Sequence, residues 1–182
     1  MEKLVKAKRQ NYHTRKDDLP VRTAAPSAAA HKGVVMSTQR VHGIDNSIMF
    51  AERGPGYHTK PHRHECEQIN YIVEGEMWFF VEGQGYHCKK GDLMRIPNNR
   101  VHWAFNCSNQ HTVIIESHSP CLIGNNAEAR KTAVSLVGDD EGEVKYVVNV
   151  VVDLDPNWVA QCEREAIGDA VLNYPAAERK AS

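Results

Sequence analysis

Two segments of this chain decide its fold: GYHTKPHRHECEQINYIVEG at residues 56–75 and GDLMRIPNNRVHWAFN at residues 91–106. In both, short runs of β-branched and aromatic residues are bounded by glycine, proline or asparagine, which is typical of successive strands joined by turns. Residues two apart on a strand face the same side, so the imidazoles of His62 and His64 can reach one ion. With His102 on a later strand, the donor set suits zinc, iron, copper or nickel. The two segments therefore predict a metal site inside a small β-structure.

Short β-type runs also flank these segments. They are VVMSTQRV (34–41), SIMFAER (47–53), HTVIIESHS (111–119), AVSLVG (133–138) and EVKYVVNVVVDL (143–154). Several short strands with turn residues between them predict an all-β, antiparallel sandwich or barrel. We place this β-barrel at residues 34–153 and expect a single domain, since 182 residues are too few for two comfortable ones.

The two ends of the chain differ from the β region. Residues 1–33 are rich in lysine and arginine. A basic arm for an anionic surface is one interpretation, and a flexible or subunit-clasping extension is the other, which we favour because compact basic patches normally include aromatic residues. Residues 154–182 should begin with a helix, because Asp155-Pro156 is a good N-cap and first-turn pair. Tyr174-Pro175 should end it.

Composition gives no sign of a nucleic-acid or membrane partner. The formal net charge is -1 and the sequence pI is about 6.8, so no global field favours a charged surface. The five cysteines are irregularly spaced, which indicates reduced thiols rather than a disulfide framework. No apolar run approaches the roughly 18–20 residues of a membrane span, and the N-terminus lacks a signal peptide's apolar core. We therefore expect a cytoplasmic protein with no nucleic-acid or membrane partner.

The spacing of the two segments resembles the two motifs of the cupin superfamily. The first motif is glycine, five residues, His-x-His, three or four residues, glutamate, six residues, glycine. Its positions are occupied here by Gly56, His62, His64, Gln68 and Gly75. The second is glycine, five residues, proline, x, glycine, two residues, histidine, three residues, asparagine. Its positions are occupied here by Gly91, Pro97, Asn99, His102 and Asn106. The resemblance implies a cupin-type β-barrel or jelly roll.

Two residues depart from the cupin pattern. Asn99 stands in place of a glycine, and asparagine tolerates a positive φ. Gln68 stands in place of the usual glutamate ligand; a neutral amide leaves a divalent site at +2 instead of +1. Such a site favours an anionic, chelating substrate, such as an enolate, diketonate, phenolate or carboxylate. The alternative is that Gln68 does not ligate and only hydrogen-bonds a ligand water.

The resemblance implies one divalent ion held by His62, His64, Gln68 and His102. We expect Fe(II) first, with manganese, nickel or zinc as alternatives. The three-histidine-plus-glutamine set resembles that of certain cupin dioxygenases, polyketide cyclases and hydroxynitrile lyases. A dioxygenase that acts on a small-molecule substrate is the leading hypothesis; a non-redox lyase, isomerase or cyclase and a non-catalytic, ligand-binding regulatory cupin are the alternatives. Cupins often pair through sheet edges, so the resemblance also implies a homodimer.

Other residues near the histidine pair have more than one interpretation. His58 shares the parity of His62 if the strand is regular, and it could then line the mouth of the site as a general acid or substrate anchor; a surface position is the alternative. Cys66 could face the cavity or be a buried, inert thiol. His118 has no partner spacing and is interpreted as an ordinary strand residue. Strand alternation places Trp103 on the face opposite the candidate ligands.

Overall fold

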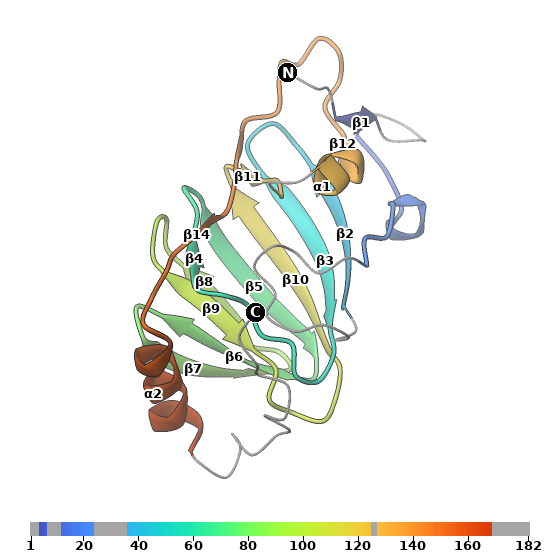
Figure 1. Ribbon diagram of the computed structural model, residues 1–182. Coiled ribbons are helices and arrows are strands. Elements are labelled where there is room, and N and C mark those ends of the chain that lie inside the picture. The colour runs from blue at the N-terminus through green and yellow to red at the C-terminus, as the bar shows by residue number, and fades with distance from the viewer. Residues whose placement is uncertain (1–3, 7–11, 24–35, 125–126, 169–182) are drawn as a thin grey trace.

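The computed structural model describes residues 4–6, 12–23, 36–124 and 127–168. Most of this chain forms β-strands, as Figure 1 shows. The strands are β1 (Val5–Lys6), β2 (Met36–His42), β3 (Ser47–Arg53), β4 (His62–Arg63), β5 (Glu67–Glu74), β6 (Glu76–Val81), β7 (Gln84–Lys89), β8 (Leu93–Ile96), β9 (His102–Phe105), β10 (Thr112–Ser119), β11 (Cys121–Leu122), β12 (Ala133–Ser135), β13 (Tyr146–Val147) and β14 (Val150–Val151). The helices are the 3₁₀ turn η1 (Lys16–Asp18), α1 (Ala127–Lys131) and α2 (Pro156–Ile167).

Most strands form two facing sheets (Figure 1), and β11 and β13 form a separate parallel pair. The larger sheet has the order β1-β12-β2-β3-β10-β5-β8, and the smaller has the order β14-β4-β9-β6-β7. Pairing is antiparallel throughout the smaller sheet and from β2 to β8 in the larger one, while β1 and β12 add parallel pairs at its edge. This confirms the expected all-β fold. Among the described residues no strand pair joins the two sheets, so the fold is an open sandwich and not a closed barrel.

Alternating burial identifies the inner face of the larger sheet. On β3 the buried residues are Ser47, Met49, Ala51 and Arg53, and the residues between them are only partly buried. On β5, Gln68, Asn70 and Ile72 are buried and alternate with more exposed residues. A period of two is the pattern of strands with one face on a core. Polar residues thus share the inner face with apolar ones, which is unusual for a purely structural core.

The sandwich has two separate apolar clusters. One lies between the sheets and includes Met49 and Ile72 from the larger sheet and Phe79 from the smaller. The other lies under α2 and contains Phe80, Trp103, Phe105 and Cys162. The side-chain alternation of β9 explains the division, because His102 faces the interior and Trp103 faces α2. The prediction that Trp103 opposes the candidate ligands is confirmed.

Helix α2 covers the outer face of the smaller sheet (Figure 1). As expected, Asp155 is its N-cap, and its side chain accepts a hydrogen bond from the Asn157 N–H at 2.9 Å. The helix ends at Ile167, earlier than expected, because Gly168 is its C-cap with a φ of +88°; Tyr174-Pro175 lies outside the described residues. A Cβ on Gly85 would lie 2.5 Å from Ala166 Cβ, so close helix–sheet packing depends on this glycine.

The described parts of residues 1–33 lie against the larger sheet. Val5–Lys6 pairs with β12, and Arg22 forms an antiparallel bridge with Thr38. Gln39 Nε2 also donates to the Lys16 carbonyl at 2.8 Å. The boundary at residue 33 and the role proposed for the basic arm stay predictions.

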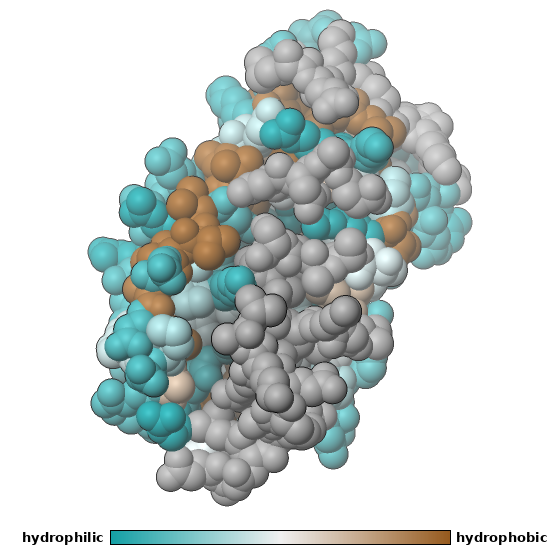
Figure 2. Space-filling model, in the orientation of Figure 1, coloured by the Kyte–Doolittle hydropathy of each residue, from teal (hydrophilic) through white to brown (hydrophobic). Residues whose placement is uncertain are grey.

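Exposed apolar residues collect near the edge of the smaller sheet. Tyr146, Val148, Val150 and Val151 are exposed, and Figure 2 shows hydrophobic surface over the region of β14. Among the described residues, no helix is both long and apolar enough to cross a membrane.

Gly75 is the position where the fold depends most on a glycine, because its φ is +73° and an added Cβ would lie 2.5 Å from the backbone oxygen of His111. We expect Gly75→Ala to lower the free energy of unfolding by about 2–4 kcal/mol, from backbone strain plus the clash. Gly91→Ala is the matched control, since φ is +94° there but nothing lies within 4 Å of the added Cβ. Urea unfolding of both variants measures the difference. Equal losses of unfolding free energy would contradict the prediction, because they would show that the contact with the His111 oxygen is relieved at no energetic cost.

Candidate metal centre

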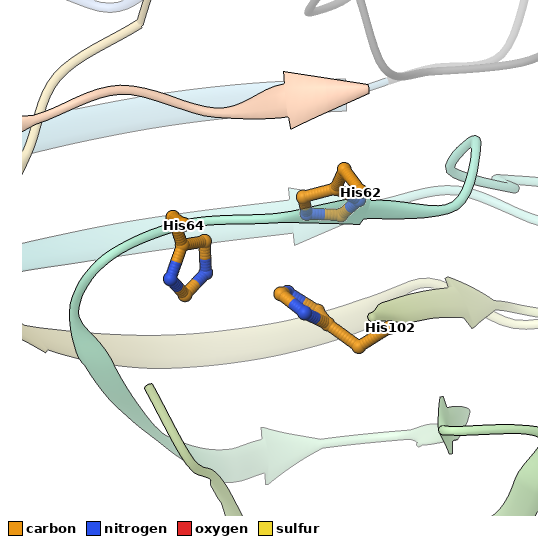
Figure 3. Close-up of side chains that lie close together, drawn as sticks. All are labelled: His62, His64 and His102. Atoms are coloured by element: carbon orange, nitrogen blue, oxygen red, sulfur yellow. The ribbon is translucent and has the colours of Figure 1, made fainter. Parts of the chain in front are cut away.

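Three histidines converge between the sheets. His62 on β4 is paired in register with His102 on β9, and His64 follows directly after β4. Their ring centroids lie 4.2 Å (His62–His102), 4.7 Å (His64–His102) and 6.1 Å (His62–His64) apart. One nitrogen of each ring lies within 4.8 Å of one nitrogen of each of the others. Figure 3 shows the three rings grouped around a common space, so they could hold one metal ion.

A repeated hydrogen bond fixes the orientation of all three rings. Each Nδ1 contacts a backbone carbonyl two residues away: His62 that of Lys60 at 2.8 Å, His64 that of Cys66 at 3.0 Å, and His102 that of Arg100 at 2.9 Å. Carbonyl oxygens only accept, so Nδ1 carries the proton and the Nε2 lone pair is left for a ligand. The buried His102 Nε2 has no hydrogen-bond partner among the described residues. The donor set therefore fits a metal ion.

Burial keeps the imidazoles neutral. It lowers the pKa of His62 to about 4 and lowers the pKa of His64. The pKa of His102 is well below its usual value, through burial first and then through the neighbouring His62 and His64. Neutral imidazole is the form that binds metals. The three side chains are thus ready to ligate at neutral pH.

Gln68 reaches the same group from the opposite sheet. Its Oε1 lies 3.0 Å from His64 Nε2, and its Nε2 donates to Asn70 Oδ1 at 2.7 Å and to Glu116 Oε2 at 3.3 Å. These two acceptors fix the amide with its oxygen toward the histidines. Neighbouring ligands with bonds of about 2.1 Å lie about 3 Å apart, so the Gln68 oxygen can join the His64 nitrogen on one ion. Whether it ligates stays a prediction.

The turn before His102 ties the second motif to the first. Asn99 has a φ of +61°, as expected for a residue in place of the motif glycine. Its N–H donates to the His64 carbonyl at 2.9 Å. Two candidate ligands far apart in the sequence are therefore held together by the backbone as well as by the β4–β9 pairing.

The structure places His58 away from the histidine group. Its Nε2 lies 2.5 Å from Glu163 Oε1 on α2, and its ring packs edge-on against Phe105. His58 also does not line the cavity next to His62, whereas Thr59 does. The parity argument required a regular strand from His58 to His62, but the strand begins only at His62, after Pro61. A role for His58 at the mouth of this site has no geometric support.

Cys66 is a buried thiol beside the site. It is 0% exposed, its Sγ lies 3.1 Å from His64 Nδ1, and burial raises its pKa to about 12. At neutral pH the thiol therefore stays protonated, which is the form that does not ligate metals. This agrees with the inert alternative.

Sequence reasoning missed several polar residues of the cavity. A cavity of about 100 Å³ lies next to His62, Gln68 and His102. It is lined by the charged or titratable residues Arg22, Arg40, Arg53, Glu116 and His118 as well as by methionine and aromatic side chains. None of these residues lies in a motif. Arg22 precedes β2, and the other four lie on β2, β3 and β10, where only their inward parity could have indicated them. The cavity has room for several water-sized groups, and so for a small organic molecule.

Comparison with known families agrees with this geometry. Residues 49–118 match the family model described as Cupin domain. This part of the chain is a cupin domain. The polyketide cyclase RemF from Streptomyces resistomycificus has a similar fold, with a TM-score of 0.53 and 14% sequence identity over 88% of this chain and 96% of that one. At this identity, the similarity to RemF concerns the cupin fold alone.

Two curated relatives are more similar in sequence. Acireductone dioxygenase of Alcanivorax borkumensis is 39% identical over 46 residues, covering 23% of this chain and 25% of that protein. Auxin-binding protein T92 of Nicotiana tabacum is 25% identical over 104 residues, covering 51% of this chain and 54% of that protein. The chain thus spans about a quarter of the length of the first relative and about half of the second. Its cupin domain is thus similar in sequence to one protein named as an enzyme and to one named as a binding protein.

Lowering the pH from 7 to 5 is expected to destabilise the metal-free protein. Burial lowers the pKa of His42 and of His62 to about 4, so the unfolded chain, with histidine pKa values near 6.5, binds more protons between these values. Stability therefore falls as the pH drops through this window, by roughly 2 kcal/mol per such histidine at pH 5. Burial raises the pKa of Glu116, which offsets part of the loss.

Urea unfolding of the metal-free protein at pH 7 and pH 5, followed by tryptophan fluorescence, measures this loss. His42→Gln should reduce the difference between the two pH values, because it removes one of the buried groups. Equal unfolding free energies at the two pH values would contradict the prediction.

Proposed function

We propose that this cupin is a metal-dependent enzyme that acts on a small, anionic, chelating organic molecule, and that the reaction is a dioxygenation. The observation that supports this most is the convergence of three neutral imidazoles and the Gln68 amide oxygen beside a cavity that also contains arginines. A site of this kind combines a place for a cation with a place for an organic anion.

His62, His64, Gln68 and His102 would hold the ion, Fe(II) in the first place and manganese, nickel or zinc as alternatives. Bound there, a divalent ion would supply Lewis acidity, and iron would add redox chemistry. The chain's own part is to orient the ligands: the Nδ1 hydrogen bonds hold the rings, and Asn70 and Glu116 hold the amide. All four donors are neutral, so an anionic substrate would balance the charge of the site.

The alternatives use the same residues differently. A lyase, isomerase or cyclase would use the ion only to stabilise an enolate, and a regulatory cupin would bind its ligand without turnover. The relative named as a dioxygenase favours the redox reaction, over the 46 residues it shares with this chain. The relative named as an auxin-binding protein keeps ligand binding without turnover as a second candidate.

Elemental analysis of protein purified without added metal separates these functions. Iron at about one ion per chain, with oxygen consumption on enolic or phenolic substrates, is the result expected for a dioxygenase. Zinc without oxygen consumption would favour the non-redox enzyme. Tight binding of a small acid with no turnover of it would favour the regulatory cupin. Homodimer formation stays a prediction, and sedimentation of the purified protein measures it.

A further inference from the structure

The cavity next to the candidate ligands contains more positive than negative side chains. Three arginines line it, Arg22, Arg40 and Arg53, and the one carboxylate among its described lining residues is Glu116. Glu116 Oε1 lies 3.5 Å from Arg53 Nη2, so this carboxylate is paired with Arg53. A cavity that keeps an excess of positive charge beside a cation site is suited to anions.

Arg40 is the arginine that this pairing leaves without a carboxylate. Its Nη1 donates to the Leu122 carbonyl, and its Nη2 lies 2.8 Å from Met49 Sδ. Among the described residues no carboxylate lies within 4.0 Å of its guanidinium. A thioether is a weak acceptor, and a partly buried charge without a directly paired carboxylate is costly. Burial lowers the pKa of Arg40 to about 10, while the nearby Glu116 charge raises it, so the guanidinium remains protonated at pH 7.

Strand register shows how Arg40 and Gln68 are separated across the inner face of the larger sheet. One row across the inner face runs from Arg40 through Met49 and Glu116 to Asn70, and the next runs from His42 through Ser47 and His118 to Gln68. Three strand spacings of about 4.8 Å therefore separate β2 from β5. Burial is the main cause that lowers the pKa of His64 and His118, and the Arg40 charge lowers both further. Arg40 is thus near the candidate metal centre, although no hydrogen bond joins its guanidinium to a candidate ligand.

His118 provides a second observation at this place. Its side chain is 1% exposed and lines the cavity, and neither ring nitrogen has a hydrogen-bond partner among the described residues. Glu116 Oε2 is the nearest carboxylate oxygen, at 3.8 Å from Nε2, which is too long for a hydrogen bond. Buried polar groups are normally hydrogen-bonded. An imidazole left in this way beside a guanidinium that no carboxylate of the described residues pairs with directly indicates a missing polar ligand.

We propose that Arg40 and His118 bind a carboxylate of the substrate at the β2–β10 side of the cavity, where His118 lies next to the candidate ligands, with its ring centroid 5.8 Å from that of His64, and Arg40 lies farther along the sheet. The substrate is then an organic acid with two anionic ends: an enolate or phenolate that reaches the metal centre, and a carboxylate that the Arg40 guanidinium and the His118 N–H bind. The assignment of the first end rests on the proposed function. The assignment of the second end rests on Arg40 and His118 alone.

Calorimetric titration of the metal-loaded protein with two matched probes tests this proposal. The probes are 3,4-dihydroxybenzoate and 4-methylcatechol, which share the chelating diol and differ in the distal carboxylate. The wild-type protein is expected to bind the acid at least about tenfold more tightly, the usual effect of a charge-assisted hydrogen bond. Arg40→Met should lose this preference while its affinity for 4-methylcatechol stays within about twofold. An Arg40→Met variant with the wild-type preference overturns the proposal.

Arg95→Met is the matched control, because Arg95 is exposed on β8 and paired with Glu67; it should keep the preference. Circular dichroism checks the fold of each variant. If Arg40→Met does not fold, His118→Leu gives the same comparison: a lost preference supports the proposal, and an unchanged one overturns it.

A protein that retains no metal would contradict the proposed function without deciding this inference. Benzoate is then the probe, titrated into the metal-free protein. Binding at least about tenfold weaker in Arg40→Met than in Arg95→Met supports the carboxylate subsite. Equal binding, or no benzoate binding to the wild type, overturns it.

Discussion

Replacing His62 and His64 together with alanine is expected to reduce bound metal from about one ion per chain to almost none. Each imidazole has its Nδ1 bonded to a carbonyl and its Nε2 turned to the shared space. Two of the four candidate donors disappear in the double variant, and the remaining His102 and Gln68 lie on different sheets. Turnover, where the wild type shows it, should fall by at least about a hundredfold, as when a metal site is lost.

Metal analysis after dialysis measures the loss, and unfolding experiments check that the variant is folded. His111→Ala is the matched control. His111 immediately precedes β10, its side chain is about half exposed, and it contacts Glu52 outside the cavity. It should keep the wild-type metal content. If the double variant still holds one ion per chain, the ligands assigned here are wrong.

The spacing of the two motifs was sufficient to predict the β-fold and the histidine group, for a physical reason. His62 and His102 are brought together by strand pairing in register, and alternation along a short strand is a local property that a sequence displays. The same alternation correctly placed Trp103 on the α2 side.

His58 shows a first limit of predictions from strand alternation. Alternation was extended across Lys60 and Pro61, where the chain is not a regular strand, so the parity of His58 carried no information. Arg40, Glu116 and His118 show a second limit. Arg40 lies on β2, and Glu116 and His118 lie in adjacent rows of β10. Only the strand order of the larger sheet, which the sequence does not display, brings the three residues to one cavity.

Replacing Gln68 with glutamate is expected to change both the stability of the site and its affinity for anions. The Gln68 amide now donates to Asn70 Oδ1 and Glu116 Oε2. A carboxylate at this position has no proton to donate and would face Glu116 Oε2 across the 3.3 Å that now separates it from the amide nitrogen, so the metal-free variant should be less stable by about 1–3 kcal/mol. The metal site should also lose one unit of positive charge and bind 4-methylcatechol at least about tenfold more weakly.

A second substitution separates these two effects. In Gln68→Glu/Glu116→Gln the carboxylate and the amide exchange places, so a donor again faces an acceptor across the same gap. We expect the double variant to recover stability relative to the sum of the two single variants, which a double-mutant cycle of urea unfolding measures. The affinity of the metal-loaded protein for 4-methylcatechol should remain low, because the charge has moved onto the candidate ligand. Unchanged stability and unchanged anion affinity in Gln68→Glu would contradict both roles of the amide, since neither its hydrogen bonds nor its neutrality would then matter.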